Sequence, residues 1–466
     1  MADPTGPETA PVLSPALALE ALYTRVRAVV KAETGKGALA LPDLDAQCRA
    51  LLQRADLPPP PPPVCGPDTR VQSLYIVTEI HPAGGHRLLL EHLLRSRVQD
   101  RHKVVFTGLL HNTRNFSLAR MADLDVPVFS PVLSDVLWDK WQALRAHIAS
   151  CAPERIFLLH HSEDVIATLL AQELEASYGP RLIFMRHADT VASLGADLMQ
   201  ATHLAIRPAQ AAALAARWPD LRIHQMPLCF DPDLPPPRMV AETRVPLDRR
   251  CARPSRRRHL KQAGYQMLRR TVWALRRARF VAMHHRAAQR SIPTDVTGPL
   301  VTATCGTEHK FHITGDFALP NVIVAVLKAG ARRHVHIGPA SARLRRACAA
   351  AVKDAGFKRN RLCFAGEIPS VADALRCHRV SVFLGSFPVD GVLSRAEAAW
   401  IGIPIGLLDR PAEQDFPPYL TGADFAPNAV LRWNSVENLH EQLRNDWSAT
   451  RRQALSEAAR HWYETA

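Results

Sequence analysis

Lysine is scarce in this sequence, which also lacks long apolar runs and paired cysteines. Only nine of the 58 basic residues are Lys, so the other 49 are Arg. No stretch approaches the roughly 20 apolar residues that a membrane-spanning helix needs, and the N-terminus lacks a basic region followed by an apolar one. The nine Cys residues form no CxxC pair and no zinc-type spacing. We therefore expect a cytoplasmic protein that touches a membrane only peripherally, at the inner face of the cytoplasmic membrane.

Short motifs of several enzyme classes are missing as well. A GxSxG elbow and a GxxxxGK[ST] loop are both absent, which excludes an α/β-hydrolase and a P-loop NTPase. Three Asp-x-Asp triplets are present, and such a pair can hold a divalent metal ion. None follows a strand of nucleotide-binding type, so we expect neither a metal nor a cofactor. The triplets are Asp43/Asp45, Asp123/Asp125 and Asp231/Asp233.

The positive charge of the chain is concentrated in one segment. The formal net charge is +14, and residues 249–290 alone hold 14 Lys and Arg without an acidic residue. Apolar residues such as Trp273 and Phe280 recur there at roughly helical intervals, which predicts a basic amphipathic helix. Such a helix can bind an anionic membrane surface or an acidic acceptor, or it can connect two domains in solvent. Nucleic acid is the least favoured partner, because no motif that reads it accompanies the charge.

Two helices are predicted ahead of a proline-rich hinge. Apolar residues recur at helical spacing over residues 14–56. Six consecutive prolines follow at residues 58–63 and predict a stiff polyproline II spacer. We interpret the helices either as a packing or dimerisation element or as part of an acceptor site.

The rest of the chain alternates short β-rich runs with helical patterns. The runs are LYIVTE, KVVFTG, RIFLLHH, RLIFMRH, THLAIR and RIHQMP, and then, after a gap, LVTATC, RHVHIG, RLCFAG, RVSVFLG and IPIGLL. This alternation predicts an α/β fold in which two doubly wound, Rossmann-like domains face each other across a cleft. The predicted parts are a helical N-terminal region with the hinge (1–63), a first Rossmann-like domain (71–230), a basic inter-domain segment (231–298), a second Rossmann-like domain (299–450) and a C-terminal helix (451–466).

The second domain contains a strand, a glycine-containing turn and a helix that together suit an anion. The strand over residues 379–384 runs into the turn 385–394, and a helix is predicted from Arg395. Backbone amides and the positive end of the helix dipole point into the cleft from such a turn, which favours a diphosphate. Ser394 is predicted either to cap this helix, with Glu397 completing a capping box, or to contact phosphate.

The stretch SVFLGSFPVDGVLSRAEAAWIGIPIGL resembles the diphosphate-binding segment of GT-B glycosyltransferases, in the inverting group that includes O-GlcNAc transferases and bacterial polysaccharide transferases. It departs from their pattern at Gly385, where Asp is usual, and at Val392 and Leu393, where small hydroxyl residues are usual. The stretch TATCGTEHKFH likewise resembles the first strand of their nucleotide domain, whose loop supplies a Lys. The resemblance implies a UDP-sugar donor bound by Lys310, Ser386, Pro388, Asp390, Gly391, Ser394 and Glu397. A surface lysine at a loop is the other interpretation of Lys310.

The first domain contains a loop of histidines and glycines between a strand and a helix, in IVTEIHPAGGHRLLLEHLL. Gly84 and Gly85 permit close approach of the backbone to a ligand. Imidazole titrates near neutral pH, so His81 or His86 can accept the proton of an acceptor hydroxyl. Similar transferases have His and Gly in this loop. Helix capping or packing is the alternative role of the two histidines.

Two polar clusters follow later strands of the same domain. His161 follows RIFLL, and Arg186, His187 and Asp189 follow LIFM. The second cluster resembles the Asn-His-Ala-Asp element of polysaccharide transferases, with Arg at the place of Asn. We interpret His161 and Arg186, with Gly84 and Gly85, as acceptor-binding residues, and His187 with Asp189 as the rival catalytic pair. A buried structural network is the alternative.

These patterns predict an inverting, metal-independent glycosyltransferase of bacterial polysaccharide biosynthesis. Its donor is a nucleotide-diphospho-sugar, and its acceptor is a glycan, a lipid-linked molecule or a protein. The alternative is a catalytically weakened GT-B module that serves as a membrane-associated binding or scaffold protein, because the Asp and the hydroxyl pair are missing. Hydrolysis of the donor distinguishes these two hypotheses.

Overall fold

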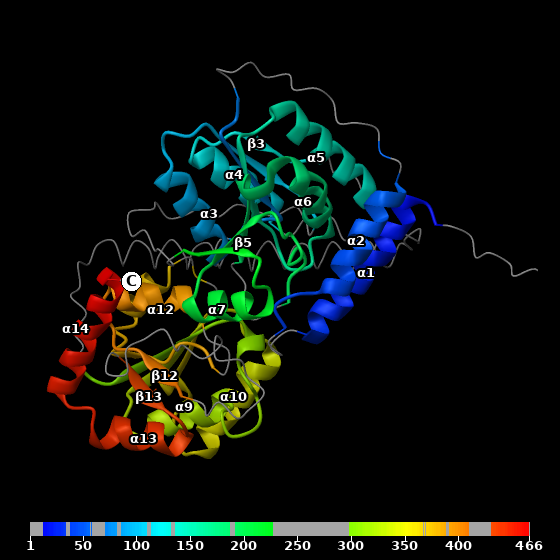
Figure 1. Ribbon diagram of the computed structural model, residues 1–466. Coiled ribbons are helices and arrows are strands. Elements are labelled where there is room, and N and C mark those ends of the chain that lie inside the picture. Colours follow the sequence, from blue (N-terminus) through cyan, green and yellow to red (C-terminus); the bar gives the residue numbers. More distant parts are fainter. Residues whose placement is uncertain are drawn as a thin grey trace, which may run out of the picture.

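The structure is a computed structural model of the 466-residue chain. It describes residues 13–33, 38–55, 57, 70–81, 85–109, 113–131, 136–186, 192–226, 298–366, 368, 370–387, 391–409 and 430–465. Figure 1 shows two domains, one above the other, with the N-terminal helices along one side. None of the described helices is both long and apolar enough to cross a membrane.

The first domain is built on a seven-stranded parallel sheet in the order β3-β2-β1-β4-β5-β6-β7. The central strands β1 and β4 are buried apolar runs without alternation, as expected where helices cover both faces of a sheet, whereas the edge strand β7 is largely exposed. The strands are β1 Ser73–Val77, β2 His102–Phe106, β3 Val128–Phe129, β4 Arg155–Leu159, β5 Leu182–Arg186, β6 Thr202–Ala205 and β7 Arg222–Gln225. The helices are α3 Gly85–Ser96, α4 Arg114–Asp123, α5 Leu137–Cys151, α6 Val165–Tyr178 and α7 Pro208–Arg217.

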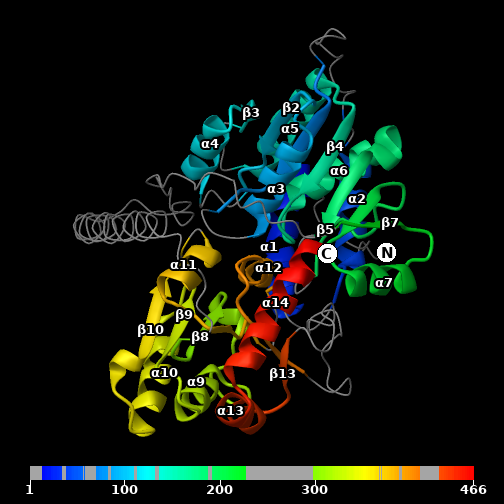
Figure 2. The ribbon, with the colours of Figure 1, turned by 90° about the vertical axis from the view of Figure 1, so that its left-hand side faces the viewer.

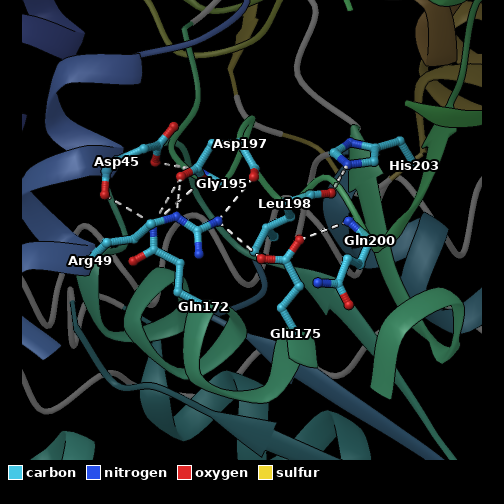
Figure 3. A network of polar contacts seen from close by, with 9 residues as sticks. All are labelled: Asp45, Arg49, Gln172, Glu175, Gly195, Asp197, Leu198, Gln200 and His203. Carbon is cyan, nitrogen blue, oxygen red and sulfur yellow. Dashed lines mark hydrogen bonds and ion pairs between the residues drawn. The ribbon is translucent and has the colours of Figure 1, made fainter. Parts of the chain in front are cut away.

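The N-terminal helices α1 (Pro15–Glu33) and α2 (Pro42–Arg54) belong to the first domain. Leu19, Val26 and Cys48 are fully buried in one apolar cluster with residues of α5 and α6. The polar side of α2 is fixed as well (Figure 3): Arg49 Nε donates to Asp197 Oδ2 at 2.6 Å, and its Nη2 donates to Glu175 Oε2 at 3.0 Å. The two predicted helices are therefore confirmed. In the structure they pack against the first domain.

The buried carboxylate of Asp45 completes this junction. Its Oδ1 accepts a hydrogen bond from the Gly195 amide at 2.7 Å (Figure 3), and burial, with the nearby Asp197, raises the pKa of Asp45 to about 8. Gln172 Nε2 donates to the Asp45 backbone carbonyl at 3.0 Å. Asp45 therefore joins α2 to the segment that follows β5, which is a structural use of one Asp-x-Asp triplet.

The second domain repeats the architecture on a smaller sheet. Four parallel strands lie in the order β10-β9-β8-β11, and a parallel pair, β12-β13, extends the domain. The strands are β8 Val301–Cys305, β9 Arg333–Ile337, β10 Leu362–Gly366, β11 Val382–Phe383, β12 Gly406–Leu408 and β13 Leu431–Trp433. The helices are η4 Glu308–Lys310, α9 Leu319–Lys328, α10 Ala342–Asp354, η5 Arg359–Arg361, α11 Val371–Cys377, α12 Val392–Trp400, α13 Val436–Asn445 and α14 Ala449–Thr465.

The two domains meet through the starts of α3 and α12. A Cβ placed on Gly85, the first residue of α3, would lie 2.5 Å from Leu393 Cδ1 of α12, so the missing side chain lets the two helix ends approach. The final helix α14 packs against α12 and runs from α13 toward the first domain (Figure 2). The predicted C-terminal helix is present, and the carboxyl edges of the two sheets lie on either side of this junction.

Candidate active site

The loop after β8 is held rigidly at the carboxyl edge of the second sheet. Gly338 has φ +126°, and any Cβ there would overlap the Gly306 carbonyl, so only glycine permits this close approach. Glu308 accepts hydrogen bonds from the Ser341 amide at 2.9 Å and the Ser341 hydroxyl at 2.8 Å. The loop therefore presents Lys310 from a fixed backbone.

The turn after β11 is held by an aromatic anchor. Phe387 is 1% exposed and packs edge to face against Phe311 and Trp433, with ring centroids 5.4 and 5.3 Å apart. Gly391 then forms the N-cap of α12, and Ser394 Oγ donates to its carbonyl at 2.8 Å. Ser386, beside the anchor, is therefore kept at the start of α12.

Four of the predicted donor-binding residues come together at this point, and we call Lys310, Ser386, Gly391 and Ser394 the donor cradle. A Cβ built on Gly391 would lie 2.9 Å from Ser394 Oγ, 3.2 Å from Ser386 Oγ and 3.5 Å from Lys310 Nζ. The Ser386 hydroxyl is buried and has no hydrogen-bond partner among the described residues. Two hydroxyls, one ammonium and a helix N-terminus converge on one small volume, which can hold an anion.

The capping box predicted for Ser394 and Glu397 is wrong. The helix begins at Val392, three residues before the predicted start, so Ser394 lies inside its first turn. Glu397 Oε2 instead accepts from the Ala372 amide at 2.9 Å and so caps a different helix, α11. The Ser370 hydroxyl also donates to Glu397, at 3.4 Å. Whether Glu397 contacts a donor stays a prediction.

Two acidic groups, the buried Glu397 carboxyl and the half-buried Cys305 thiol, lie near the cradle. Burial raises the pKa of the Glu397 carboxyl to about 7, although the Ala372 amide and Arg87 of the first domain oppose this shift. Burial, with the nearby Glu397, raises the pKa of the Cys305 thiol to about 12, so the thiol is neutral at pH 7. At neutral pH the thiol therefore adds no negative charge beside Lys310, whereas the Glu397 carboxyl is partly ionised.

On the first domain, His81 is paired with a buried carboxylate. His81 Nε2 lies 3.2 Å from Glu79 Oε1, and the exposed fractions of the two side chains are 39% and 4%. The other oxygen of Glu79 accepts from the Thr113 amide at 3.2 Å, which fixes the carboxylate. An accessible imidazole oriented by a fixed carboxylate is the arrangement that a general base requires. Glu79 was missed from the sequence, although it follows a strand two residues before His81.

His86 and His161 lie beside His81. The His86 and His161 ring centroids are 5.1 Å apart, and those of His81 and His161 are 6.0 Å apart. His86 Nε2 donates to the Leu159 carbonyl at 2.5 Å, so this ring is held by the end of β4. The three predicted histidines therefore gather in one cluster, and His81 has the more accessible geometry for proton transfer.

The strand ends beneath this cluster are tied together by Asp164. Its Oδ2 accepts from the hydroxyls of Thr78 and Thr107, both at 2.6 Å, while its Oδ1 caps α6 through the Ala167 amide at 3.0 Å. The Thr78 hydroxyl in turn accepts from the His161 amide at 2.8 Å. This network fixes the backbone on which His81 and His161 stand.

Arg186 lies in the interior of the first domain. It is 4% exposed, its Nε donates to His203 Nδ1 at 3.1 Å, and His203 Nε2 donates to the Leu198 carbonyl at 2.8 Å (Figure 3 shows the latter bond). Burial, with Arg186 beside it, lowers the pKa of His203 to about 3, so the ring stays neutral. These contacts give Arg186 a structural role, and its binding of an acceptor stays a prediction.

Several sequence-based predictions fall outside the described residues. These are Gly84, His187, Asp189, Pro388, Asp390, the polyproline hinge at 58–63 and the basic segment 249–290. Within the described part of the chain, no group of three or more His, Cys, Asp or Glu side chains is arranged to hold a metal ion.

Neither a protein-family model nor a curated protein matches the sequence. Solved structures do match the fold. HepE from Anabaena, solved in complex with UDP and glucose, has a TM-score of 0.51 and 11% identity over 84% of this chain and 95% of its own. A glycosyltransferase from Rickettsia africae has a TM-score of 0.53 and 9% identity over 85% and 94%. The chain therefore has the GT-B fold of two Rossmann-like domains, as the sequence predicted, and shares it with a glycosyltransferase.

Proposed function

We propose that this protein transfers a sugar from a nucleotide-diphospho-sugar, a UDP-sugar, to an acceptor hydroxyl, with inversion and without a metal. The convergence of polar atoms on Gly391 carries this proposal. That place lies at the carboxyl edge of a parallel sheet and at a helix N-terminus, where α/β proteins bind phosphates. The similarity to HepE, whose structure holds UDP and glucose, supports a UDP-sugar as the donor.

The donor cradle supplies the charge stabilisation that the reaction needs. When the bond between the anomeric carbon and the diphosphate oxygen breaks, the electron pair leaves with UDP. The Lys310 ammonium, the Ser386 and Ser394 hydroxyls and the N-terminus of α12 then face that developing negative charge. The lysine and the helix dipole together stabilise the charge that a divalent cation stabilises in metal-dependent enzymes.

We assign proton removal to His81. Glu79 faces Nε2 at 3.2 Å, so Nδ1 accepts the proton as the acceptor oxygen forms its new bond to the sugar carbon. The carboxylate stabilises the resulting imidazolium. Gly85 lies between this cluster and Leu393 of α12, which brings base and cradle to one junction. The acceptor, a glycan, a lipid-linked molecule or a protein, enters from this side.

Replacement of Lys310 by Ala tests the donor assignment. Calorimetric titration with UDP should show affinity that is weaker by about 10- to 150-fold, the range for one hydrogen bond to a charged group. Lys328→Ala is the matched control, because it removes the same charge from an exposed position on α9 of the same domain. Equal UDP affinity in the two variants would remove Lys310 from the site.

The alternative function, a catalytically weakened binding module, predicts a different experimental result from the glycosyltransferase. Such a protein binds the UDP-sugar but releases no UDP, and its binding role depends on the basic segment 249–290 at a membrane. Measurement of UDP release alongside binding therefore separates the two functions.

A further inference from the structure

A second polar cavity lies at the opposite edge of the second sheet from the donor cradle. Its volume is about 880 Å³, and it is formed where β8, β9 and β10 begin and where α11 ends. The donor cradle follows the other end of β8, beyond Cys305. The length of the strands therefore separates the two sites, and a ligand in the cavity does not touch the cradle.

The cavity is lined by positive charge. Its lining includes Arg332, Arg333, Arg361, Arg376, Arg379 and His378, and it includes no acidic residue. Among the described residues, none of the five arginines forms an ion pair with Asp or Glu. Burial lowers the pKa of Arg376, and the nearby Asp373 opposes this shift. Five like charges in one concave surface repel one another, and an anion would relieve this repulsion.

Several of these side chains are held in place by groups other than carboxylates. Arg333 Nη2 donates to the His378 carbonyl at 3.1 Å, and Arg361 Nη1 donates to the Arg332 carbonyl at 3.0 Å. The guanidinium of Arg376 stacks 4.7 Å from the Trp400 ring centroid. These three guanidinium groups keep further N–H donors, so they are held in place without being saturated.

Arg379 follows the C-terminal end of α11 in a left-handed backbone conformation. Its φ is +51°, a left-handed conformation that a long side chain rarely adopts. The Val380 amide donates to the Leu375 carbonyl and the Arg379 amide to the Arg376 carbonyl, both at 2.9 Å, which is a common way for a helix to end. Here the conformation directs the chain so that Arg379 lines the cavity.

We propose that this cavity is a second anion site, specific for a compact polyphosphate. Its volume falls in the range of small-molecule sites, which is about 300–1,000 Å³. A planar guanidinium group can bind two phosphate oxygens at once. Five such groups therefore match a ligand that carries several phosphates better than a ligand that carries a single carboxylate. The basic segment 249–290, with 14 Lys and Arg, has the wrong charge to occupy it.

The test is calorimetric titration of the full chain with tripolyphosphate at about 0.15 M salt, where surface attraction is screened. UDP is present in excess to fill the donor cradle. We expect saturable binding to one site. In the Arg332→Ala/Arg379→Gly variant this binding should weaken by about 100-fold, since each charge-assisted contact contributes a factor of about ten or more. Glycine at 379 accepts the positive φ, so the backbone is retained.

The matched control is Arg346→Ala/Arg444→Ala, which removes two exposed arginines from α10 and α13. It should leave tripolyphosphate affinity within about 2-fold, because surface charge away from a site has little effect. The proposal would be overturned if tripolyphosphate did not bind, or if UDP displaced it completely. It would also be overturned if the cavity variant bound tripolyphosphate as tightly as the unchanged protein, or if the control variant lost as much affinity as the cavity variant. If the double variant does not fold, Arg332→Gln replaces it, with an expected loss of about 10-fold.

Discussion

Addition of a single methyl group at Gly391 tests the donor cradle directly. The new Cβ would lie 2.9 Å from Ser394 Oγ, 3.2 Å from Ser386 Oγ and 3.5 Å from Lys310 Nζ. A phosphate oxygen that binds these three groups must occupy the same volume, so the methyl group displaces it. Loss of two charge-assisted hydrogen bonds, at about 1.5–3 kcal/mol each, weakens UDP binding by about 3–6 kcal/mol. This corresponds to about a 10²- to 10⁴-fold increase in Kd.

The same substitution should leave the fold in place. Gly391 has φ −122° and ψ 94°, which alanine adopts without strain. Alanine is a poorer N-cap than glycine, so we expect a decrease of up to about 1 kcal/mol in the free energy of unfolding. UDP affinity is measured by calorimetry and stability by urea unfolding, with uridine as the control ligand because it lacks phosphate. Unchanged UDP affinity in a folded Gly391→Ala protein would refute the assignment of phosphate to the cradle.

Three other predictions concern the base, the pH dependence and the N-terminal helices. His81→Ala should lower turnover by about 10²-fold or more, with UDP affinity retained. Glu79→Gln should lower turnover as well, whereas His86→Ala should retain more activity. Equal loss of turnover in the two histidine variants would contradict the assignment of His81 as the base. The folding free energy should be greatest near pH 6, as urea titrations between pH 4.5 and 8 will show. Below that pH, the unfolded chain binds more protons, because the pKa values of His203 and His334 are lowered to about 3 in the folded chain. Above that pH, the folded chain binds more protons, because its pKa values for Asp45 and Glu397 are raised to about 8 and 7. Stability that keeps rising to pH 8 contradicts these assignments. Arg49→Ala should lower stability by roughly 2 kcal/mol, because Glu175 and Asp197 lose their cation, and Arg25→Ala, which loses one bond to Gln47 on the surface, should change it little.

The architecture was predictable because it follows from the local spacing of apolar residues. Continuous apolar runs alternating with helical ones predicted two parallel sheets, and both are present. The two-residue strand β3 and the short strand β13 were not predicted, since so few residues carry no period. The equally short strands β11 and β12 were located because each lies within a longer apolar run.

The site was predictable only in part, because its contacts join distant residues. A strand followed by a glycine turn indicated the donor cradle, and Lys310, Ser386, Gly391 and Ser394 do lie together. Spacing within one helix suggested that Glu397 completes a local cap, but its carboxylate reaches the start of α11, 25 residues earlier in the chain. The Glu79–His81 pair was visible as two neighbouring residues, yet only the structure shows their side chains meeting.

Release of UDP from a UDP-sugar is the measurement that tests the proposed activity most directly. The full-length protein is incubated with UDP-glucose, UDP-galactose and UDP-N-acetylglucosamine, and free UDP is quantified against time. We predict saturable release from at least one donor, lost in Lys310→Ala and retained in Lys328→Ala. No release from any donor, or equal release by the two variants, would contradict a glycosyltransferase that binds its donor in this cradle.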